Sequence, residues 1–372
     1  MKSKMLTAVG AIALAATFAV PALFHKTAAA AGGVPRFEPD PYWPKPLPNN
    51  WISGGIGGIY VDSQDHIWVA NRPKSVDKAV KNAALNPPQG DCCIPAPPVL
   101  EFDMQGNLIQ GWGGPGKGYD WPDNEHGMFV DYKGNVWIAG SGRNDSQILK
   151  FTHDGKFLLQ IGHHGKSGGS NDTENLGKAA ALTVYQKTNE VFVADGYANR
   201  RVIVFDADTG AYKRHWGAYG NKPDDKASNE RTFEGRGPEQ FNLPHGIAIS
   251  NDDLVYVCDR DNNRIQVFRP DGTFVKEGFI ERNTRGEFGT AFDVAFSPDK
   301  QQKFLYVPDG SNVKVQILNR QTLEVVGWFG GHGGRGTYDF YRVHNIASDS
   351  KGNIYLGEGV GQRLYKWSYK GM

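Results

Sequence analysis

The chain repeats one unit six times, and each copy consists of four short apolar segments separated by turns. Residues 126–162 and 245–280 show the unit clearly, with Lys-Gly-Asn or Asp-Gly turns between segments such as MFVD, VWIA and QILKF. These segments are rich in Val, Ile, Phe, Tyr and Trp, and no later stretch keeps a helical period. Six four-stranded units of roughly 40–50 residues predict an all-β fold, a six-bladed β-propeller.

The sixth copy stops after its third strand, so its fourth strand must come from another part of the chain. We expect residues 37–47 (FEPDPYWPKPL) to supply it, because strands from both ends of the chain would then cover an open sheet edge. Phe37, Tyr42 and Trp43 favour this interpretation, since aromatic side chains are seldom left in solvent. The alternative is that the proline-rich stretch 35–48 is a loose leader.

Composition agrees with a turn-rich β protein that has a large core. The 372 residues include 47 Gly, and 12% of them are aromatic, which suits tight turns and packing between wedge-shaped blades. The formal net charge is only +1, so nothing indicates binding to nucleic acid or to an anionic membrane surface. We expect a monomer.

The N-terminus has the three parts of an export signal: a basic start (MKSK), an apolar stretch, and small residues around positions 28–31. We therefore expect residues 1–31 to be a cleaved signal peptide and residues 32–372 to be the propeller. The mature protein would be periplasmic or secreted and free of the membrane. An uncleaved membrane anchor is the alternative, because the apolar stretch approaches spanning length.

The three cysteines leave a thiol unpaired in an exported protein. Cys258 lies in an apolar strand, and we interpret it as a small buried side chain. Cys92 and Cys93 are adjacent, so they could form a vicinal disulfide, or Cys92 could bridge elsewhere. The sequence does not distinguish these pairings.

Histidines stand at the start of the innermost strand in every second repeat: His126, His245 and His344. In a closed six-membered ring these positions face the axis and lie roughly 120° apart. One such histidine would usually just hydrogen-bond a neighbouring carbonyl, but three at one register predict a metal site. Three neutral imidazoles with a free fourth position are typical of catalytic zinc. The intervening repeats have small or apolar residues there, around Gly57, Ala180 and Phe292.

Two further polar residues fall on the same face of the predicted ring, where the second strands end. Arg72 follows the second strand of the first repeat, and Tyr197 follows that of the third. The long insertions 73–98, 163–179 and 221–243 also reach this face. Long loops on one side of a rigid scaffold commonly carry function, so we expect the active site on this face.

The repeats resemble NHL repeats, and the chain resembles the peptidyl-α-hydroxyglycine α-amidating lyases, which are six-bladed propellers with zinc on the axis. The resemblance covers essentially the whole mature chain. Its strongest segments are VDSQDHIWVANRP, EHGMFVD, ADGYANRRVIVF, FNLPHGIAIS, CDRDNNRIQVF and VHNIAS. It implies cleavage of a peptidyl- or acyl-α-hydroxyglycine, a carbinolamide, to a primary amide and glyoxylate.

The resemblance also assigns roles to residues at the ends of the inner and second strands. It implies a base that removes the proton of the substrate hydroxyl, an arginine that holds negative charge, and a structural calcium that is bound partly by backbone carbonyls. The residues at these positions are His126, His245 and His344 for zinc, Tyr197 and Arg72 for catalysis, and Ile59, Met128 and Asn345 for calcium.

Three positions depart from the family pattern. Asn345 replaces an aspartate and brings no charge to the calcium, and Ala198 replaces a cysteine beside the catalytic tyrosine. Arg342 replaces a methionine two residues before the third histidine, which places a cation near the substrate pocket. Together with the insertion 73–98, these departures indicate a bacterial relative whose pocket differs.

Two other classes of protein are open at this point. A zinc hydrolase or lactonase-like propeller would use the metal to activate water, and it would need a carboxylate near the axis, for which Asp293 is the candidate. A non-catalytic NHL scaffold would bind a protein or glycan across the same face. The copper monooxygenase that makes the hydroxyglycine would be a separate partner, because this chain has no ligands for it.

Overall fold

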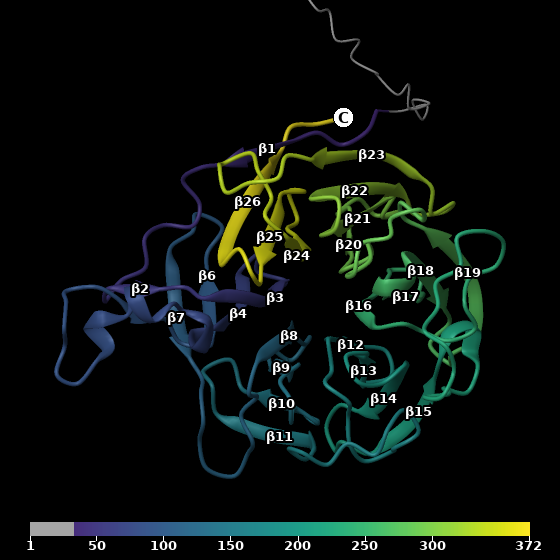
Figure 1. Cartoon of the computed structure of the whole chain (residues 1–372), viewed down its shortest axis with the longest axis horizontal. Helices are drawn as coiled ribbons and strands as arrows, with labels where there is room; N and C mark the ends of the chain where they lie inside the picture. Colours follow the sequence, from purple (N-terminus) through teal and green to yellow (C-terminus); the bar gives the residue numbers. More distant parts are fainter. Residues whose placement is uncertain (1–32) are drawn as a thin grey trace, which may run out of the picture.

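The structure, a computed structural model, describes residues 33–372. These residues form six four-stranded sheets arranged as blades around a central axis, together with a two-stranded ribbon (Figure 1). Helical structure in the described part of the chain is limited to 3-10 turns of three residues. The predicted all-β, six-bladed propeller is confirmed.

Each blade is an antiparallel meander, and its first strand lies next to the axis. The inner strands of blades 1 to 6 are β3 (Gly55–Val61), β8 (Glu125–Val130), β12 (Ala181–Tyr185), β16 (Pro244–Ile249), β20 (Ala295–Phe296) and β24 (Val343–Ser348). The second strands are β4 (Ile67–Arg72), β9 (Val136–Gly140), β13 (Glu190–Asp195), β17 (Val255–Asp259), β21 (Phe304–Asp309) and β25 (Ile354–Glu358).

The outer half of each blade closes the ring toward solvent. The third strands are β6 (Val99–Phe102), β10 (Gln147–Phe151), β14 (Arg201–Asp206), β18 (Arg264–Phe268), β22 (Lys314–Asn319) and β26 (Arg363–Tyr369). The fourth strands are β7 (Leu108–Trp112), β11 (Phe157–Gly162), β15 (Tyr212–Trp216), β19 (Phe274–Phe279), β23 (Val325–Gly330) and, in blade 6, β1 (Phe37–Asp40).

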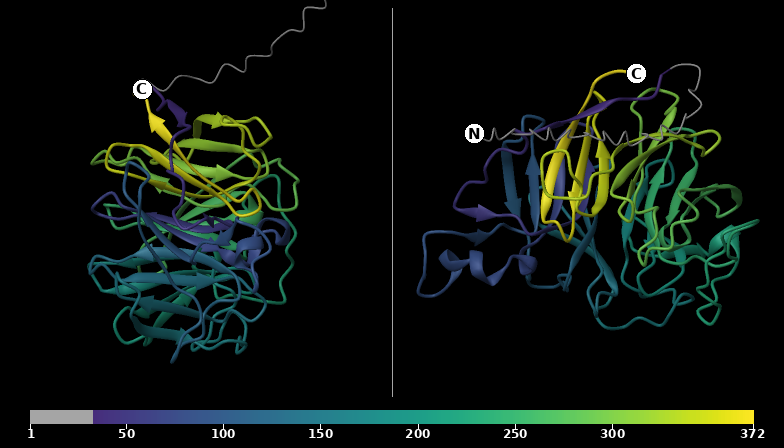
Figure 2. Two further views of the ribbon diagram at one scale, coloured as in Figure 1. Left: turned by 90° about the vertical axis from the view of Figure 1, so that its left-hand side faces the viewer. Right: turned by 45° about the horizontal axis from the view of Figure 1, so that its top comes forward.

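Both ends of the described chain build blade 6. β1 pairs antiparallel with β26, with Phe37 opposite Tyr369, and Figure 2 shows the two strands side by side. Trp43 is buried between blades 6 and 1, where its ring packs edge-on against Tyr355. The predicted closure is confirmed, and the interpretation of this stretch as a loose leader is wrong. Tyr42 does not take part, because it lies in the turn after β1 and is 77% exposed.

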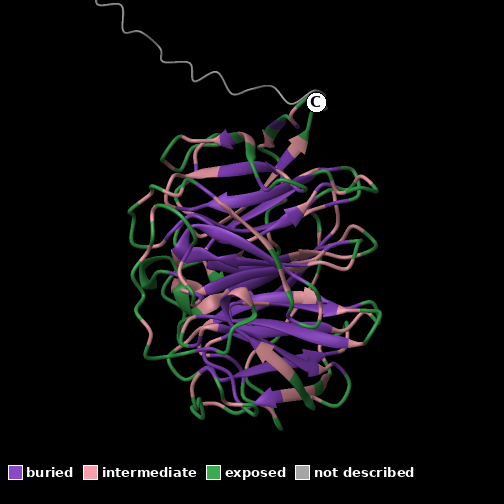
Figure 3. Ribbon diagram, turned by 90° about the vertical axis from the view of Figure 1, so that its right-hand side faces the viewer, coloured by how far each residue is buried: buried purple, intermediate pink, exposed green. Residues whose placement is uncertain are grey.

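The core lies between neighbouring blades. Successive side chains of a strand point to opposite faces, and each blade covers a face of the next one. Trp68 and Trp137, in the second strands of blades 1 and 2, are fully buried in this way. Figure 3 shows the resulting pattern of buried strands and exposed connections. Packing on both faces fixes each blade and therefore holds the inner strands in place around the axis.

The two ends of the ring differ in their connections. Short turns join the first strand to the second and the third to the fourth at one end, which we call the turn face. The other end, which we call the loop face, carries the long segments. These are residues 73–98, 113–124, 163–180, 217–243, 280–294 and 331–342.

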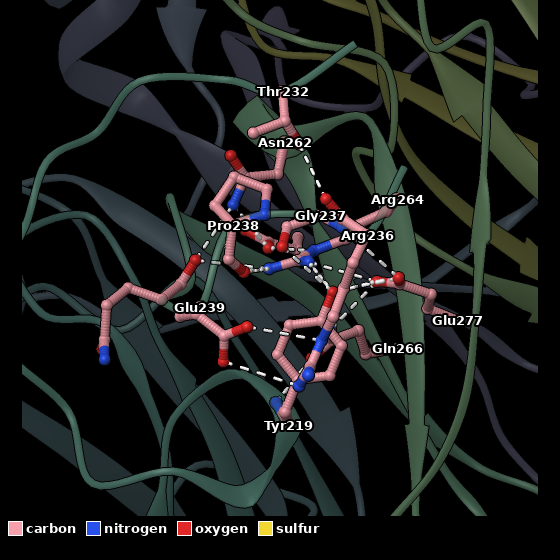
Figure 4. Close-up of polar contacts among 12 residues, drawn as sticks. Tyr219, Thr232, Arg236, Gly237, Pro238, Glu239, Asn262, Arg264, Gln266 and Glu277 are labelled. Carbon is pink, nitrogen blue, oxygen red and sulfur yellow. Dashed lines mark hydrogen bonds and ion pairs between the residues drawn. The ribbon is translucent and has the colours of Figure 1, made fainter. Parts of the chain in front are cut away.

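Buried ion pairs anchor three of the loop-face segments. In blade 4, Arg264 Nε lies 2.7 Å from the carboxylate of Asp259, and its guanidinium also donates to the Pro238 carbonyl at 2.7 Å. Figure 4 shows this cluster, in which Arg264 also contacts Glu277 and the hydroxyl of Tyr219. Each such pair fixes a loop to the blade that follows it. The equivalent pairs in blades 3 and 6 are Asp195–Arg201 and Glu358–Arg363.

The cysteines and the N-terminal segment complete the description. Cys92 and Cys93 form a disulfide within the segment 73–98, and Cys258 is a buried free thiol. The predicted signal peptide, residues 1–31, lies outside the described residues. Between residues 33 and 372 there is no helix with the length and apolar character that a membrane span requires.

Candidate metal centre

Three buried histidines from alternate blades meet on the axis. His126 lies on β8, His245 on β16 and His344 on β24. The centroids of their rings are 4.8–5.0 Å apart in every pairing. One nitrogen from each ring lies within 4.8 Å of the other two, so the three side chains could hold a single metal ion. The convergence that the repeat register predicts is present in the structure.

Hydrogen bonds fix the orientation of all three rings. Nδ1 of His126 lies 2.6 Å from the carbonyl oxygen of Ala180, and Nδ1 of His245 lies 2.5 Å from that of Phe292. Nδ1 of His344 lies 2.8 Å from Oδ1 of its neighbour Asn345. Because these oxygens can only accept, each Nδ1 carries the proton and donates. Each Nε2 therefore keeps its lone pair, as a metal-binding imidazole requires.

Close contact between inner strands makes these bonds reachable. A Cβ atom on Gly127, next to His126, would lie 2.8 Å from the Ala180 carbonyl oxygen. A Cβ atom on Gly246, next to His245, would lie 2.6 Å from the backbone of Asp293. Any side chain at these positions would push the inner strands apart, so glycine is needed for the histidines to reach the carbonyls of the next blade.

Burial keeps the three imidazoles neutral. It lowers the pKa of His344 to about 3, and it holds the pKa values of His126 and His245 well below their usual range. Nearby positive charges act in the same direction, and Arg260 contributes to the shift of all three. Three neutral rings with free lone pairs suit a divalent cation and disfavour protons.

Tyr197 lies directly against the histidines. It follows β13, and its hydroxyl is 2.9 Å from Nε2 of His126 and 3.0 Å from Nε2 of His245. One phenolic proton can serve only one of these nitrogens at a time, so the hydroxyl shares the space in which the Nε2 lone pairs converge. The predicted tyrosine is therefore at the centre of the site.

Arg72 ends β4 beside the same cluster. Its Nε donates to the carbonyl oxygen of Glu125 at 2.6 Å, which holds the side chain against blade 2. Burial lowers the pKa of Arg72, while Tyr197 and Glu125 act in the opposite direction. Its charge also lowers the pKa values of His126 and His344. The structure thus brings this predicted residue to the site.

Two arginines that the sequence argument did not assign to catalysis also lie here. Arg260 follows β17, and its guanidinium lies 3.5 Å from the Tyr197 hydroxyl and forms an ion pair of 2.9 Å with Asp261. Arg342 precedes β24, and its guanidinium lies 3.5 Å from the centre of the Phe288 ring. Register places Arg260 after the second strand of blade 4, as Arg72 ends that of blade 1, but it does not separate Arg260 from arginines that anchor loops, such as Arg264.

A cavity of about 650 Å³ lies on the turn-face side of the histidines. Its lining includes His245 and Asp293, and its rim includes acidic residues of the turns. Asp293 is buried, and burial raises the pKa of its carboxyl group to about 7. The residues predicted to bind calcium, Ile59, Met128 and Asn345, line this same cavity. Oδ1 of Asn345 accepts the His344 bond, so a calcium ion would have to share that oxygen.

The other histidines of residues 33–372 lie away from the axis. His66 and His153, from neighbouring blades, both contact the buried carboxylate of Glu101, at 2.8 and 3.2 Å. His164 pairs with Asp123 on the loop face. None of these joins the group formed by the three axial histidines in the described chain.

Comparisons with known proteins show similarity to NHL-repeat proteins and to peptide-amidating enzymes. The NHL repeat family matches residues 241–268. Mouse NHL repeat-containing protein 3 is 27% identical over 300 residues, which cover 78% of this chain and 70% of that protein. Rat peptidylglycine alpha-amidating monooxygenase is 25% identical over 339 residues, 85% of this chain but only 30% of that protein. The fruit-fly peptidyl-alpha-hydroxyglycine alpha-amidating lyase 1 is 26% identical over 280 residues, 68% of this chain and 47% of that protein.

Solved structures agree on the fold alone. A streptogramin B lyase superposes with a TM-score of 0.52 at 13% identity, covering 90% of this chain and 98% of its own. A gluconolactonase from Xanthomonas campestris has the same TM-score at 12% identity, covering 86% of this chain and 87% of its own. The chain is therefore a six-bladed propeller that carries an NHL repeat and has distant sequence similarity to peptidyl-α-hydroxyglycine α-amidating lyases.

Proposed function

We propose that this protein is a zinc-dependent lyase that cleaves a peptidyl- or acyl-α-hydroxyglycine to a primary amide and glyoxylate. The observation that carries the proposal is the set of three axial histidines, each with Nδ1 bonded to an oxygen; Nε2 of His126 and of His245 also contacts the hydroxyl of Tyr197. The distant similarity to amidating lyases supports the same reaction.

The histidines fit a zinc ion by the chemistry of their donor set. His126, His245 and His344 offer three neutral nitrogens from rigid inner strands, which leaves room for a ligand from the substrate. A zinc ion bound there would supply a Lewis acid that makes the substrate hydroxyl more acidic. Calcium at Ile59, Met128 and Asn345 is a further part of the proposal.

Tyr197 and Arg72 would have separate roles, proton removal and stabilisation of negative charge. Tyr197, as a phenolate, would remove the proton from the hydroxyl of R–CO–NH–CH(OH)–COO⁻, since its oxygen lies where the histidine nitrogens converge. The C–N bond then breaks as the new C=O bond of glyoxylate forms, and the nitrogen takes up a proton to give R–CO–NH₂. No water is consumed.

Arg72 would stabilise negative charge in this step. Its planar guanidinium is buried against the tyrosine and is held by the Glu125 carbonyl, so it is oriented before substrate binds. Arg260, within 3.5 Å of the Tyr197 hydroxyl, would favour the phenolate in the same way. The positive charges of the two arginines lower the pKa values of His126 and His344 and so favour neutral imidazole ligands.

A metal-dependent hydrolase is the second candidate. Asp293 favours it, because this buried carboxyl group lies next to the inner strand of His245 and its raised pKa, about 7, suits a general base. A hydrolase would cut the acyl–nitrogen bond with water and release a carboxylate. A scaffold that only binds a partner would do neither.

The setting of the reaction is part of the proposal. We infer an exported, monomeric enzyme that takes a small acyl or peptide substrate and does not bind nucleic acid or the membrane. The near-neutral net charge supports the last part, the absence of binding to nucleic acid or to an anionic membrane. The hydroxylated substrate would come from a separate oxygenase.

The deciding experiment uses the mature protein, stripped with a chelator and reloaded with zinc, and N-benzoyl-α-hydroxyglycine as substrate. We expect glyoxylate and benzamide in equal amounts from the zinc-loaded protein and neither from the metal-free protein. Release of benzoate would instead identify the hydrolase. One zinc per chain with no product would contradict both enzymes. The exposed-loop variant His332→Ala serves as the control for a histidine off the axis.

A further inference from the structure

Arg342 brings a positive charge to the loop face beside the axial site. It lies at the end of the segment 331–342, two residues before His344 on β24. Its guanidinium stacks on Phe288, 3.5 Å from the ring centre, and Phe288 belongs to the neighbouring loop-face segment 280–294. Both side chains are partly exposed. The two loops thus present a cation and an aromatic surface together.

No acidic side chain of the described residues pairs directly with the guanidinium of Arg342, although the charges of Glu287 and Asp261 act to raise its pKa. In the part of the chain that the structure describes, it forms no hydrogen bond and no ion pair within 4.0 Å. Other arginines of the loop face do have partners: Arg260 pairs with Asp261, and Arg363 pairs with Glu358. Glu287 lies next to Phe288 in the chain and is exposed. A half-buried guanidinium without a direct partner is free to bind an anion from elsewhere through charge-assisted hydrogen bonds.

The α-carboxylate of the substrate does not need this residue. The guanidinium of Arg260 lies 3.5 Å from the Tyr197 hydroxyl, and Arg72 interacts electrostatically with the same tyrosine, so the single carboxylate of a hydroxyglycine has two guanidinium groups to bind. Arg260 also reaches the Phe288 ring, with its guanidinium 5.8 Å from the ring centre. Arg342 therefore adds a further positive charge next to the aromatic ring that Arg260 also contacts, beyond what one carboxylate requires.

We propose that Arg342 and Phe288 form a subsite for a second negative group, so that the preferred substrate is an acyl-α-hydroxyglycine whose acyl part has an apolar body and an acidic end. The aromatic ring would pack on the body, and the planar guanidinium would bind the carboxylate in two-pronged fashion. This inference rests on the proposed function for the reaction, but its recognition step can be tested without turnover.

The kinetic test compares two matched substrates, N-benzoyl-α-hydroxyglycine and its 4-carboxybenzoyl counterpart, with the zinc-loaded protein. We expect kcat/KM to be about tenfold higher for the carboxylated substrate, the effect of roughly 1.4 kcal/mol of additional binding. In Arg342→Gln and Arg342→Met the ratio should fall to about one. Arg342→Lys should keep part of the preference for the carboxylated substrate, because the positive charge remains but bidentate binding of the carboxylate is lost.

Arg335 provides a matched control. It lies on the same segment, is exposed, and stacks on the Tyr341 ring with its guanidinium 4.6 Å from the ring centre. Arg335→Gln removes the same charge and the same kind of stacking, and it should leave the substrate ratio as in the parent protein. If Arg335→Gln lowers the ratio as much as Arg342→Gln, the preference is a long-range effect of charge and the subsite is wrong.

A binding experiment separates this inference from the proposed reaction. Hippurate and 4-carboxyhippurate lack the hydroxyl group and cannot react, so their dissociation constants report recognition alone. We expect the zinc-loaded protein to bind 4-carboxyhippurate about tenfold more tightly and Arg342→Gln to bind both equally. If no glyoxylate forms but this difference is found, the reaction is wrong and the subsite stands. Equal binding by the parent protein, or a preference that persists in Arg342→Gln, would overturn the subsite.

Discussion

Blades 2, 4 and 6 supply the axial histidines, whereas blades 3 and 5 supply the oxygens that orient two of them. His126 reaches the carbonyl of Ala180 in the segment leading to β12, and His245 reaches that of Phe292, which precedes β20. One set of blades therefore provides ligands and the other provides their hydrogen-bond partners. A ring with an even number of blades lets every histidine have such a neighbour.

Blade 1 breaks the alternation. His344 does not use a carbonyl of β3 but the side chain of its own neighbour, Asn345. A Cβ atom on Gly57, at the equivalent position of blade 1, would lie 2.3 Å from the Glu125 carbonyl oxygen of blade 2. Two ligands are thus held by backbone groups that no substitution removes, and the third is held by a side chain that can be replaced.

Removing a ligand should have the largest effect. We expect His245→Ala to weaken zinc binding by more than the roughly 10- to 100-fold that loss of an orienting partner causes, and to abolish glyoxylate formation. Metal content after dialysis and the product assay check this. His215→Ala, on the outer strand β15, is the control and should keep both. If His245→Ala retains one tightly bound zinc, blades 2, 4 and 6 do not provide the three zinc ligands.

Replacing the tyrosine should affect turnover and leave the ligands in place. We expect Tyr197→Phe to lower kcat by about 10²–10⁴-fold, because the base is lost, while zinc stays bound at one per chain. Single-turnover kinetics and metal analysis measure the two properties separately. Unchanged kcat would remove Tyr197 from the mechanism, and loss of the zinc would make it part of the metal site.

The side-chain partner of His344 allows a direct test of the contrast between the blades. We expect Asn345→Ala to raise the zinc dissociation constant by about 10- to 100-fold, because the ring of His344 loses its orientation. Asn345→Asp keeps the acceptor oxygen and should bind zinc at least as tightly as the parent protein. Competition with a fluorescent chelator gives both constants. Equal affinity of all three proteins would mean that packing alone orients the ring.

The smallest effect concerns blade 5, where Asp293 follows the carbonyl partner of His245. The pKa of Asp293 is about 7 in the folded protein, above its ordinary value of 3.8, so the folded state keeps a proton that the unfolded state releases between these values. Its contribution to stability is therefore present at acidic pH and is lost as the pH rises through about 7.

Asp293→Asn removes this titration. The difference in unfolding free energy between the parent protein and the variant should fall by up to about 1.4 kcal/mol per pH unit between roughly pH 4 and 7. Urea unfolding of the metal-free proteins at several pH values measures it. Parallel pH profiles would show that the carboxyl group is ionised in the folded protein.

The repeat register was enough to predict the fold, the convergence of the three histidines, and the presence of Arg72 and Tyr197 at the same face. A propeller relates equivalent positions by rotation, so one aligned register places many side chains at once. Ring closure could be predicted for the same reason, because an incomplete last blade requires a strand from elsewhere.

Contacts that depend on side-chain orientation could not be predicted in this way. The bond from His344 to Asn345 depends on rotamers, and the stacking of Arg342 on Phe288 depends on the path of two irregular loops. Arg260 was overlooked for another reason: several arginines occupy similar turns, and those such as Arg264 are engaged in loop anchoring. Position alone does not separate the two uses.

The pairing of β1 with β26 has a consequence for folding. Phe37 meets Tyr369, so the sixth sheet forms only when strands from the two ends of the described chain come together. His344 belongs to that sheet, whereas His126 and His245 lie in sheets built from consecutive strands. We therefore expect the third histidine to join the other two only when the ring closes.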